Sequence, residues 1–154
     1  MTEPATRQFI LRLMTTAPAA YLATIGRNGA PEIRAMLNLR NRQQYPGLVE
    51  LYAAHADDLL VHLTTNSSSA KMDQIRANPA AGLYFCDPAS FQGVMLGGPL
   101  RIVTDPALKR RIWQDGWEQY YPGGPDDPDY TILSLHPTVA KGWHSGGRFE
   151  LSVP

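Results

Sequence analysis

An Asn-Gly pair between two strand-like stretches constrains the fold of this chain more than any other feature of its sequence. Residues 20–25 form the run AYLATI, Asn28-Gly29 follows, and residues 32–40 then alternate in character. Asn-Gly between apolar runs favours a β-hairpin, because both residues tolerate positive φ angles. Successive side chains of a strand point to opposite faces. The sequence therefore predicts a hairpin over 20–40, whose second strand carries Ile33, Ala35, Leu37 and Leu39 on one face and Glu32, Arg34, Met36, Asn38 and Arg40 on the other.

The remaining elements extend this hairpin into a mainly β structure. Apolar runs predict further strands at 59–65, 81–86, 91–103, 130–135 and 139–143, with a bend at Gly97-Gly98 like that of a barrel corner. Helical spacing and capping residues predict helices at 3–17, 70–77 and 106–115, and a short one at 48–52. We expect six or seven strands in a small, largely antiparallel β-barrel with flanking helices, formed by residues 1–154 as a single domain.

Composition and charge exclude several classes of protein. With 14 basic and 14 acidic residues the net charge is zero, which argues against a general nucleic-acid binder. Charged residues make up only 18% of the chain, which favours an oligomer. No apolar run approaches the roughly 18 residues of a membrane helix. Cys86 is the single cysteine, so we expect no disulfide, no zinc site and a cytoplasmic protein.

The sequence contains no known motif for a metal site or for a nucleotide-binding loop. The sequence has no glycine-rich phosphate loop and no nucleophile elbow. Its four histidines lack metal-ligand spacing. His62 alternates with apolar neighbours, so we expect it to be partly buried and hydrogen-bonded.

One group of residues has the chemistry of a phosphate-binding site. Arg34 lies in the second predicted strand, Thr64 and Thr65 end the third, and Ser67, Ser68, Ser69 and Lys71 open the helix that follows. Hydroxyl groups, a helix N-terminus, a lysine and an arginine all favour a phosphate monoester. The alternatives are that the serines only cap their helix, that Lys71 is solvated, and that Arg34 pairs with Glu32 or with an acidic residue elsewhere.

Aromatic residues form a second group, before a loop rich in proline and glycine. Trp113, Trp117, Tyr120 and Tyr121 are more typical of a core or subunit interface than of a cofactor site. For Trp143, at the end of the last clear strand, burial and a place in a site are equally expected.

Three segments resemble a known family. They are residues 23–36, the phosphate segment Leu63-Thr64-Thr65 with Ser69-Ala70-Lys71 and residues 74–79, and a second half that includes Gly98, residues 103–106, Trp113, Trp143 and the loop Pro122-Gly123-Gly124-Pro125-Asp126-Asp127-Pro128. Over about residues 5–145 the chain resembles the pyridoxamine 5'-phosphate oxidase-like flavoproteins, and within them the general stress protein 26 branch.

The resemblance implies a six-stranded antiparallel FMN-binding split barrel that forms a homodimer with flavin at the interface. It implies that Arg34 and Lys71 hold the FMN phosphate, aided by Thr65 and Ser69. The strand Ala35-Met36-Leu37-Asn38 would run beside the flavin ring, Gln92 or Gly93 would approach from the partner chain, and Trp143 would lie near the ring edge.

The expected function is that of an FMN-binding oxidoreductase of unknown substrate. Ala70 stands where the oxidase proper has a second basic residue, and its C-terminal Arg-Leu-His-Asp-Arg stretch is missing here. Pyridoxamine phosphate is therefore not the expected substrate. The alternatives are a non-catalytic flavin-binding stress or sensor protein, or the same barrel with a deazaflavin or haem, for which His62 or His136 would be axial ligands.

Overall fold

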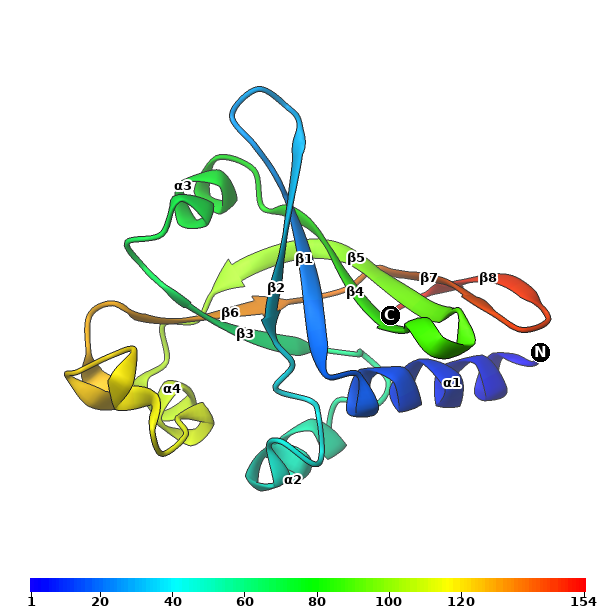
Figure 1. The fold of residues 1–154 in the computed structure, drawn as a ribbon, viewed down its shortest axis with the longest axis horizontal. Helices are drawn as coiled ribbons and strands as arrows, with labels where there is room; N and C mark the ends of the chain where they lie inside the picture. Colours follow the sequence, from blue (N-terminus) through cyan, green and yellow to red (C-terminus); the bar gives the residue numbers. More distant parts are fainter.

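The computed structural model describes residues 1–154 and contains four α-helices and eight β-strands (Figure 1). The helices are α1 (Glu3–Thr16), α2 (Val49–Ala53), α3 (Ala70–Ala77) and α4 (Pro106–Ile112), with 3-10 turns at Pro46–Leu48, Pro88–Ser90, Trp117–Gln119 and Gly124–Asp126. The strands are β1 (Ala19–Ile25), β2 (Pro31–Leu37), β3 (Val61–Asn66), β4 (Ala80–Asp87), β5 (Gln92–Ile102), β6 (Tyr130–Leu135), β7 (Val139–His144) and β8 (Gly147–Ser152).

Six of the strands form a nearly closed barrel. Hydrogen-bonded neighbours follow the order β2-β1-β4-β5-β6-β3, and every pair is antiparallel. The two end strands, β2 and β3, lie next to each other without a ladder between them, so the barrel is split there. The predicted mainly β, six-stranded antiparallel split barrel is confirmed.

The barrel turns its corner where the sequence predicts a bend. Strand β5 pairs with β7 over Gly93–Gly97 and with β6 over Leu100–Ile102, so it changes partner at Gly97-Gly98. A Cβ atom on Gly98 would collide with the backbone carbonyl of His136. Only glycine allows the two backbones to approach this closely.

The Asn-Gly hairpin is also confirmed. Ile25 pairs with Pro31, Gly29 adopts a φ of 81°, and the Ala30 amide donates to Asn28 Oδ1 at 3.1 Å. β2 ends at Leu37 instead of residue 40. The cause is Asn38, whose buried side-chain amide donates to the carbonyls of Met14 and Ala17 at the end of α1 and draws the chain out of the sheet.

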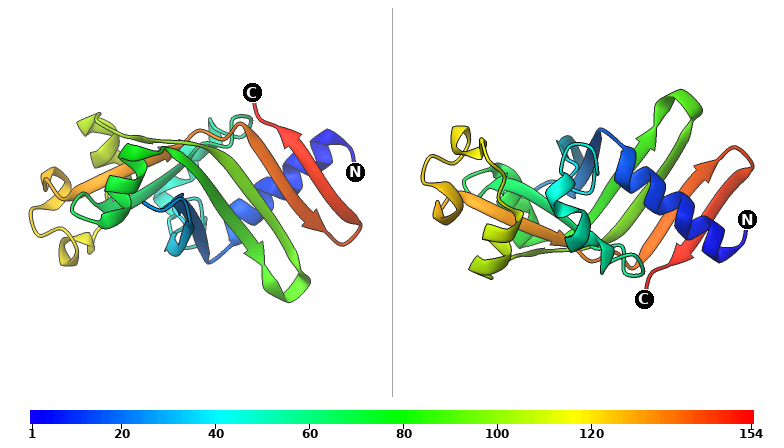
Figure 2. Two further views of the ribbon diagram at one scale, coloured as in Figure 1. Left: turned by 90° about the horizontal axis from the view of Figure 1, so that it is seen from above. Right: turned by 90° about the horizontal axis from the view of Figure 1, so that it is seen from below.

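The two faces of the sheet differ in their surroundings. On the inner face, Leu22, Leu83, Leu96 and Ala140 lie in register and pack into the main core. Helix α1 crosses this face and buries the predicted apolar side chains Ile10, Leu13 and Met14 against it (Figure 2). The outer face carries a second row in register, formed by Ala35, Tyr21, Tyr84, Met95 and Lys141.

The apolar side of β2 belongs to this outer face and is exposed. Ile33 is 70% exposed and Leu37 is 42% exposed, whereas Arg34 and Met36 on the opposite side are half-buried. The alternation of β2 thus places Arg34 toward the protein and Ile33 and Leu37 toward solvent.

The predicted number of strands and the predicted end of one helix are also wrong. The prediction stops at six or seven strands, but a further strand, β8, pairs with β7 at the edge. Its alternation of Phe149 and Leu151 with Arg148 and Glu150 is a strand signal that the analysis missed. Helix α4 begins as predicted with Asp105 accepting from the Ala107 amide, but it ends at Ile112. No helix of the chain has the length and apolar character needed to cross a bilayer.

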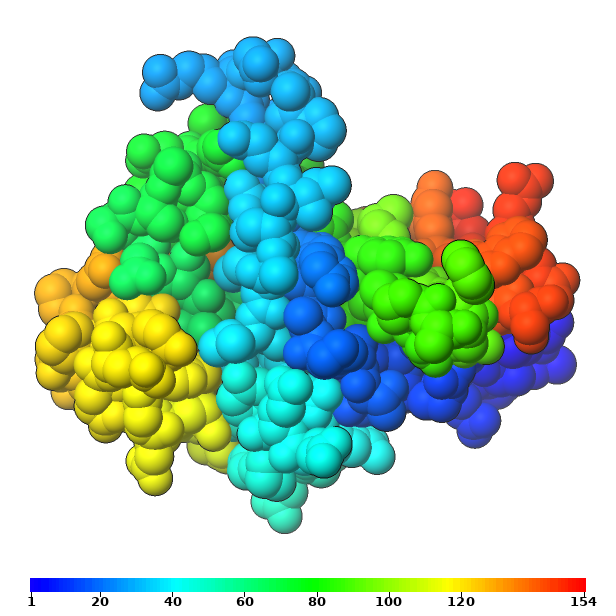
Figure 3. All heavy atoms as spheres, in the orientation of Figure 1, coloured from blue at the N-terminus to red at the C-terminus, as the bar shows by residue number.

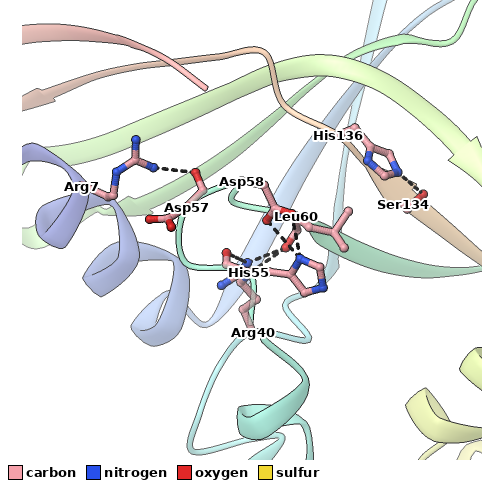
Figure 4. Close-up of polar contacts among 8 residues, drawn as sticks. All are labelled: Arg7, Arg40, His55, Asp57, Asp58, Leu60, Ser134 and His136. Atoms are coloured by element: carbon pink, nitrogen blue, oxygen red, sulfur yellow. Dashed lines mark hydrogen bonds and ion pairs between the residues drawn. The ribbon is translucent and has the colours of Figure 1, made fainter. Parts of the chain in front are cut away.

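Arg40, on the predicted polar side of the second strand, is buried. It is 4% exposed and donates from Nε and Nη2 to the Leu60 carbonyl at 2.8 and 2.7 Å, and from Nη2 to the His55 carbonyl at 2.8 Å (Figure 4). Asp58 joins the same loop by accepting from the Leu60 amide. The arginine therefore holds the loop that leads from α2 into β3.

Candidate functional site

A groove of about 440 Å³ lies where the barrel is split, between β2 and β3. In Figure 3 β2, in light blue, stands beside the yellow segment that follows α4, and green α3 lies above that yellow segment. Seven of the twelve lining residues are hydrophobic, so the groove is an apolar slot with one polar end. The lining residues are Pro18, Ala19, Ala35, Met36, Leu37, Thr64, Thr65, Asn66, Lys71, Trp117, Tyr120 and Tyr121.

Lys71 and two hydroxyl groups form the polar end. Lys71 Nζ donates to Thr65 Oγ1 at 2.8 Å, and Thr65 Oγ1 lies 3.4 Å from Ser69 Oγ. Lys71 has no carboxylate partner among the ion pairs of the chain. Burial lowers its pKa, and the nearby Arg34 guanidinium lowers it further. An anion bound here would relieve both effects, because it would compensate an unpaired cation.

Arg34 lies behind the groove, on the inner side of β2. Its Nη1 donates to Thr24 Oγ1 at 2.7 Å and to the Leu22 carbonyl at 3.3 Å, and its Nη2 donates to Gln74 Oε1 at 3.4 Å. It forms no ion pair, so the alternative of a pair with Glu32 is wrong. The structure thus brings two unpaired cations, Arg34 and Lys71, to one end of the groove.

Aromatic residues form the wall opposite β2. Trp117 and Tyr121 are nearly buried, at 6% and 4% exposure, in a second apolar cluster, while Tyr120 is 58% exposed. Tyr121 OH lies 3.0 Å from Thr64 Oγ1, which ties this wall to β3. The sequence predicts Trp117 in a core or interface. The core place is confirmed, and the same residues also line the groove.

The serines before α3 have separate roles. Ser69 is the N-cap residue of α3 but makes no side-chain capping bond, and it faces Thr65. Ser67 and Ser68 instead bind Asp129, through the Ser67 hydroxyl at 3.0 Å and the Ser68 amide at 2.9 Å. Asn66 also donates to this carboxylate, at 2.6 Å. Asp129 therefore fixes the start of α3, next to Lys71.

Protonation of Asp129 should loosen this segment. The hydrogen bonds from Asn66 and Ser68 lower the pKa of Asp129 to about 2, below the roughly 3.9 of an unfolded chain. Its stabilising contribution is therefore present above about pH 4 and lost as the pH falls through about 2. We expect Asp129→Asn to lower the melting temperature at pH 7 and to flatten its decline between pH 4 and pH 2. An unchanged acid profile by circular dichroism would contradict this role.

Four predicted site residues lie outside the groove. The Asn38 side chain holds the end of α1, and Gln92 Oε1 accepts from Arg12 Nη2 at 2.7 Å. Gly93 lies under the ring of Tyr84, where a Cβ atom would collide with the phenol. Gly93 pairs with Trp143, which is 52% exposed on the outer face. The structure therefore gathers Ala35, Met36, Leu37, Thr64, Thr65 and Lys71 in the groove, with Arg34 and Ser69 beside it.

Comparison with known proteins identifies the family. A sequence model described as pyridoxamine 5'-phosphate oxidase matches residues 3–144. The chain belongs to the pyridoxamine 5'-phosphate oxidase family. The resemblance inferred from the sequence is thereby confirmed, including its branch. A solved protein from Clostridium acetobutylicum, related to general stress protein 26, is 31% identical, covers 95% of both chains and has a TM-score of 0.74. General stress protein 26 of Bacillus subtilis (strain 168) is 26% identical over 100 residues, 63% of this chain and 71% of that protein.

Solved structures of lower identity share the fold with this chain. An FMN-binding, pyridoxamine 5'-phosphate oxidase-related protein of Nostoc punctiforme is 18% identical, with a TM-score of 0.65, and the match covers 97% of this chain and 87% of that one. A heme-binding protein of Mycobacterium smegmatis is 14% identical, with a TM-score of 0.69, and the match covers 99% of this chain and 60% of that one. At these identities the likeness shows the split barrel alone.

Proposed function

We propose that this protein is a homodimeric FMN-binding flavoprotein and an oxidoreductase. The observation that carries the proposal is the pair Arg34 and Lys71, two cations without carboxylate partners at the polar end of an apolar groove. A dianionic phosphate suits that end, because charge-assisted hydrogen bonds from Lys and Arg are strong. The Thr65 and Ser69 hydroxyls add neutral donors.

The rest of the groove suits the flavin ring. β2 is an end strand, so the backbone groups of Ala35–Leu37 on its free edge have no ladder partner and are available to the polar edge of the ring. Trp117, Tyr120 and Tyr121 offer the apolar opposite wall. Bound flavin would supply hydride transfer, and these residues would bind and orient it. A cytoplasmic location stays a prediction.

The test is the small molecule that accompanies the purified protein. We expect a yellow protein with flavin absorption, from which denaturation releases a compound with the mass of FMN. A protein that stays colourless and does not bind FMN added in excess would overturn the proposal. Steady-state reduction by NADH or NADPH with candidate acceptors then separates an oxidoreductase from a flavin-binding sensor, since only the enzyme turns over.

The exposed outer face supports the proposed dimer. Ile33, Leu37, Tyr21, Tyr84 and Trp143 are between 38% and 70% exposed on neighbouring strands. An apolar patch of this kind is typical of an interface, and a twofold dimer would pair it with itself. Ala35 and Leu37 belong to both this face and the groove, so a partner would cover the cofactor. Gln92 or Gly93, with Trp143, would then approach the flavin of the other subunit.

A charged residue on this face should separate the subunits. We expect Ile33→Asp to give a monomer by sedimentation velocity and to weaken FMN retention, because desolvating a carboxylate at an apolar interface is unfavourable. Val49→Asp is the matched control, since Val49 is also exposed but lies on α2. A dimer that survives Ile33→Asp would place the interface elsewhere.

A haem in the groove has less support. No histidine lines the groove. His62 is 2% exposed, with Nδ1 3.2 Å from Tyr52 OH, and burial lowers its pKa to about 4, so the expected hydrogen bond is confirmed and the side chain is more deeply buried than expected. His136 Nε2 lies 3.0 Å from Ser134 Oγ. A Soret band in the purified protein would favour haem over FMN.

A further inference from the structure

Arg34 and Glu32 lie two residues apart on β2 and point to the same side of the strand, roughly 7 Å apart at their Cα atoms. A direct ion pair between them is within reach of two long side chains. The structure has none, because the Gln74 side chain from α3 lies between them.

The hydrogen bonds fix which way round the Gln74 amide lies. Its Nε2 donates to Glu32 Oε2, and its Oε1 accepts from Thr24 Oγ1 at 2.7 Å and from Arg34 Nη2 at 3.4 Å. A carboxylate only accepts hydrogen bonds and a guanidinium only donates them. In the flipped amide, Oε1 would face the Glu32 carboxylate and Nε2 would face the Arg34 guanidinium, and neither contact could be a hydrogen bond. Thr24, which is 1% exposed, completes the network by accepting from Arg34 Nη1 at 2.7 Å.

We propose that Gln74 is a positioning residue that separates Arg34 from Glu32 and keeps the guanidinium charge available to the phosphate of the bound ligand. The inference rests on the proposed function. A neutral amide aligns Arg34 without cancelling its charge, whereas a carboxylate in contact would. Helix α3 carries Lys71 as well as Gln74, three residues apart and so on one helix face. One helix thus supplies one phosphate ligand and orients the other.

Removal of Gln74 should let Arg34 and Glu32 pair. We expect Gln74→Ala to raise the Kd for FMN about tenfold, the effect of one charge-assisted hydrogen bond. The Kd for riboflavin, which lacks the phosphate, should change less than twofold. Both are measured by quenching of flavin fluorescence. Gln74→Met, which keeps the length of the side chain, is measured beside it and should behave alike even where the alanine variant folds poorly.

A second substitution separates positioning from support of the fold. Adding Glu32→Gln to Gln74→Ala removes the competing carboxylate, so FMN affinity should recover to within about threefold of the wild type. The matched control adds Asp73→Asn instead. Asp73 lies on α3, its side chain is 84% exposed and it faces Arg76, so this change alters the net charge equally without freeing Arg34.

The results distinguish the two proposals. Wild-type protein that does not bind FMN overturns the proposed function. Wild-type protein that binds FMN, with a Gln74→Ala variant of equal affinity, overturns the positioning role alone. The same conclusion follows if FMN and riboflavin lose affinity equally, or if Asp73→Asn restores binding as well as Glu32→Gln does.

Discussion

Arg34→Ala and Lys71→Ala should each weaken FMN binding by about 1.5–3 kcal/mol, and the double variant should lose most of the affinity. Each substitution removes a cation that has no carboxylate partner in the protein. The substitution therefore removes binding free energy from the complex with the phosphate and breaks no ion pair within the protein. The losses from the two single substitutions should not add fully in the double variant. Arg34 and Lys71 repel each other, as the lowered Lys71 pKa shows, so removal of one cation also removes this repulsion from the other.

Riboflavin is the informative comparison ligand for these variants. It presents the same ring to the groove and has no phosphate, so its affinity should change much less. Arg76→Ala is the matched protein control, since Arg76 lies on the same helix, is 53% exposed and pairs with Asp73. Isothermal titration at two salt concentrations checks the charge dependence. Equal losses for both flavins would mean that Arg34 and Lys71 support the fold and do not bind the phosphate.

Arg40→Ala should destabilise the folded protein by about 3 kcal/mol, the cost of leaving buried carbonyls without a charged donor. Arg40 is 4% exposed and donates three hydrogen bonds to the loop before β3. Its guanidinium also lies 4.7 Å from the centre of the Tyr52 ring. Burial lowers its pKa to about 10, so the group stays charged at neutral pH.

Chemical denaturation measures this change directly. Arg42→Ala is the control, because Arg42 is exposed two residues away, and such substitutions shift stability by about 0.5 kcal/mol or less. Arg40→Lys should recover only part of the loss, since an ammonium group cannot present the planar fork that reaches both the Leu60 and His55 carbonyls. A variant Arg40→Ala as stable as Arg42→Ala would show that water replaces these contacts.

Local signals predicted the elements that local interactions build. The Asn28-Gly29 turn and the Asp105-Pro106 helix start each depend on residues near one another in sequence, and each is where the pattern indicates. Lys71 was found for a similar reason, since it lies in the first turn of a serine-led helix, whereas Arg34 lies on a separate strand and was joined to it by residue type and by the family resemblance.

The rest of the candidate site depends on distant contacts. Tyr121 reaches the groove through Thr64, 57 residues away, and Gln74 reaches Arg34 across 40 residues. No periodicity in either segment reports such a contact. The exposure of Ile33 and Leu37 could not be predicted either, because alternation shows which side chains share a face of the strand but not which face packs inward.

The corner in β5 has a consequence for how the protein unfolds. This single strand of 11 residues is laddered to β4 and β7 on one part and to β6 on the other. Separation of β4 and β7 from β5, or of β6 from β5, breaks hydrogen bonds of the same strand. Unfolding should therefore be one cooperative transition, and the slowest amide protons to exchange should lie along β5.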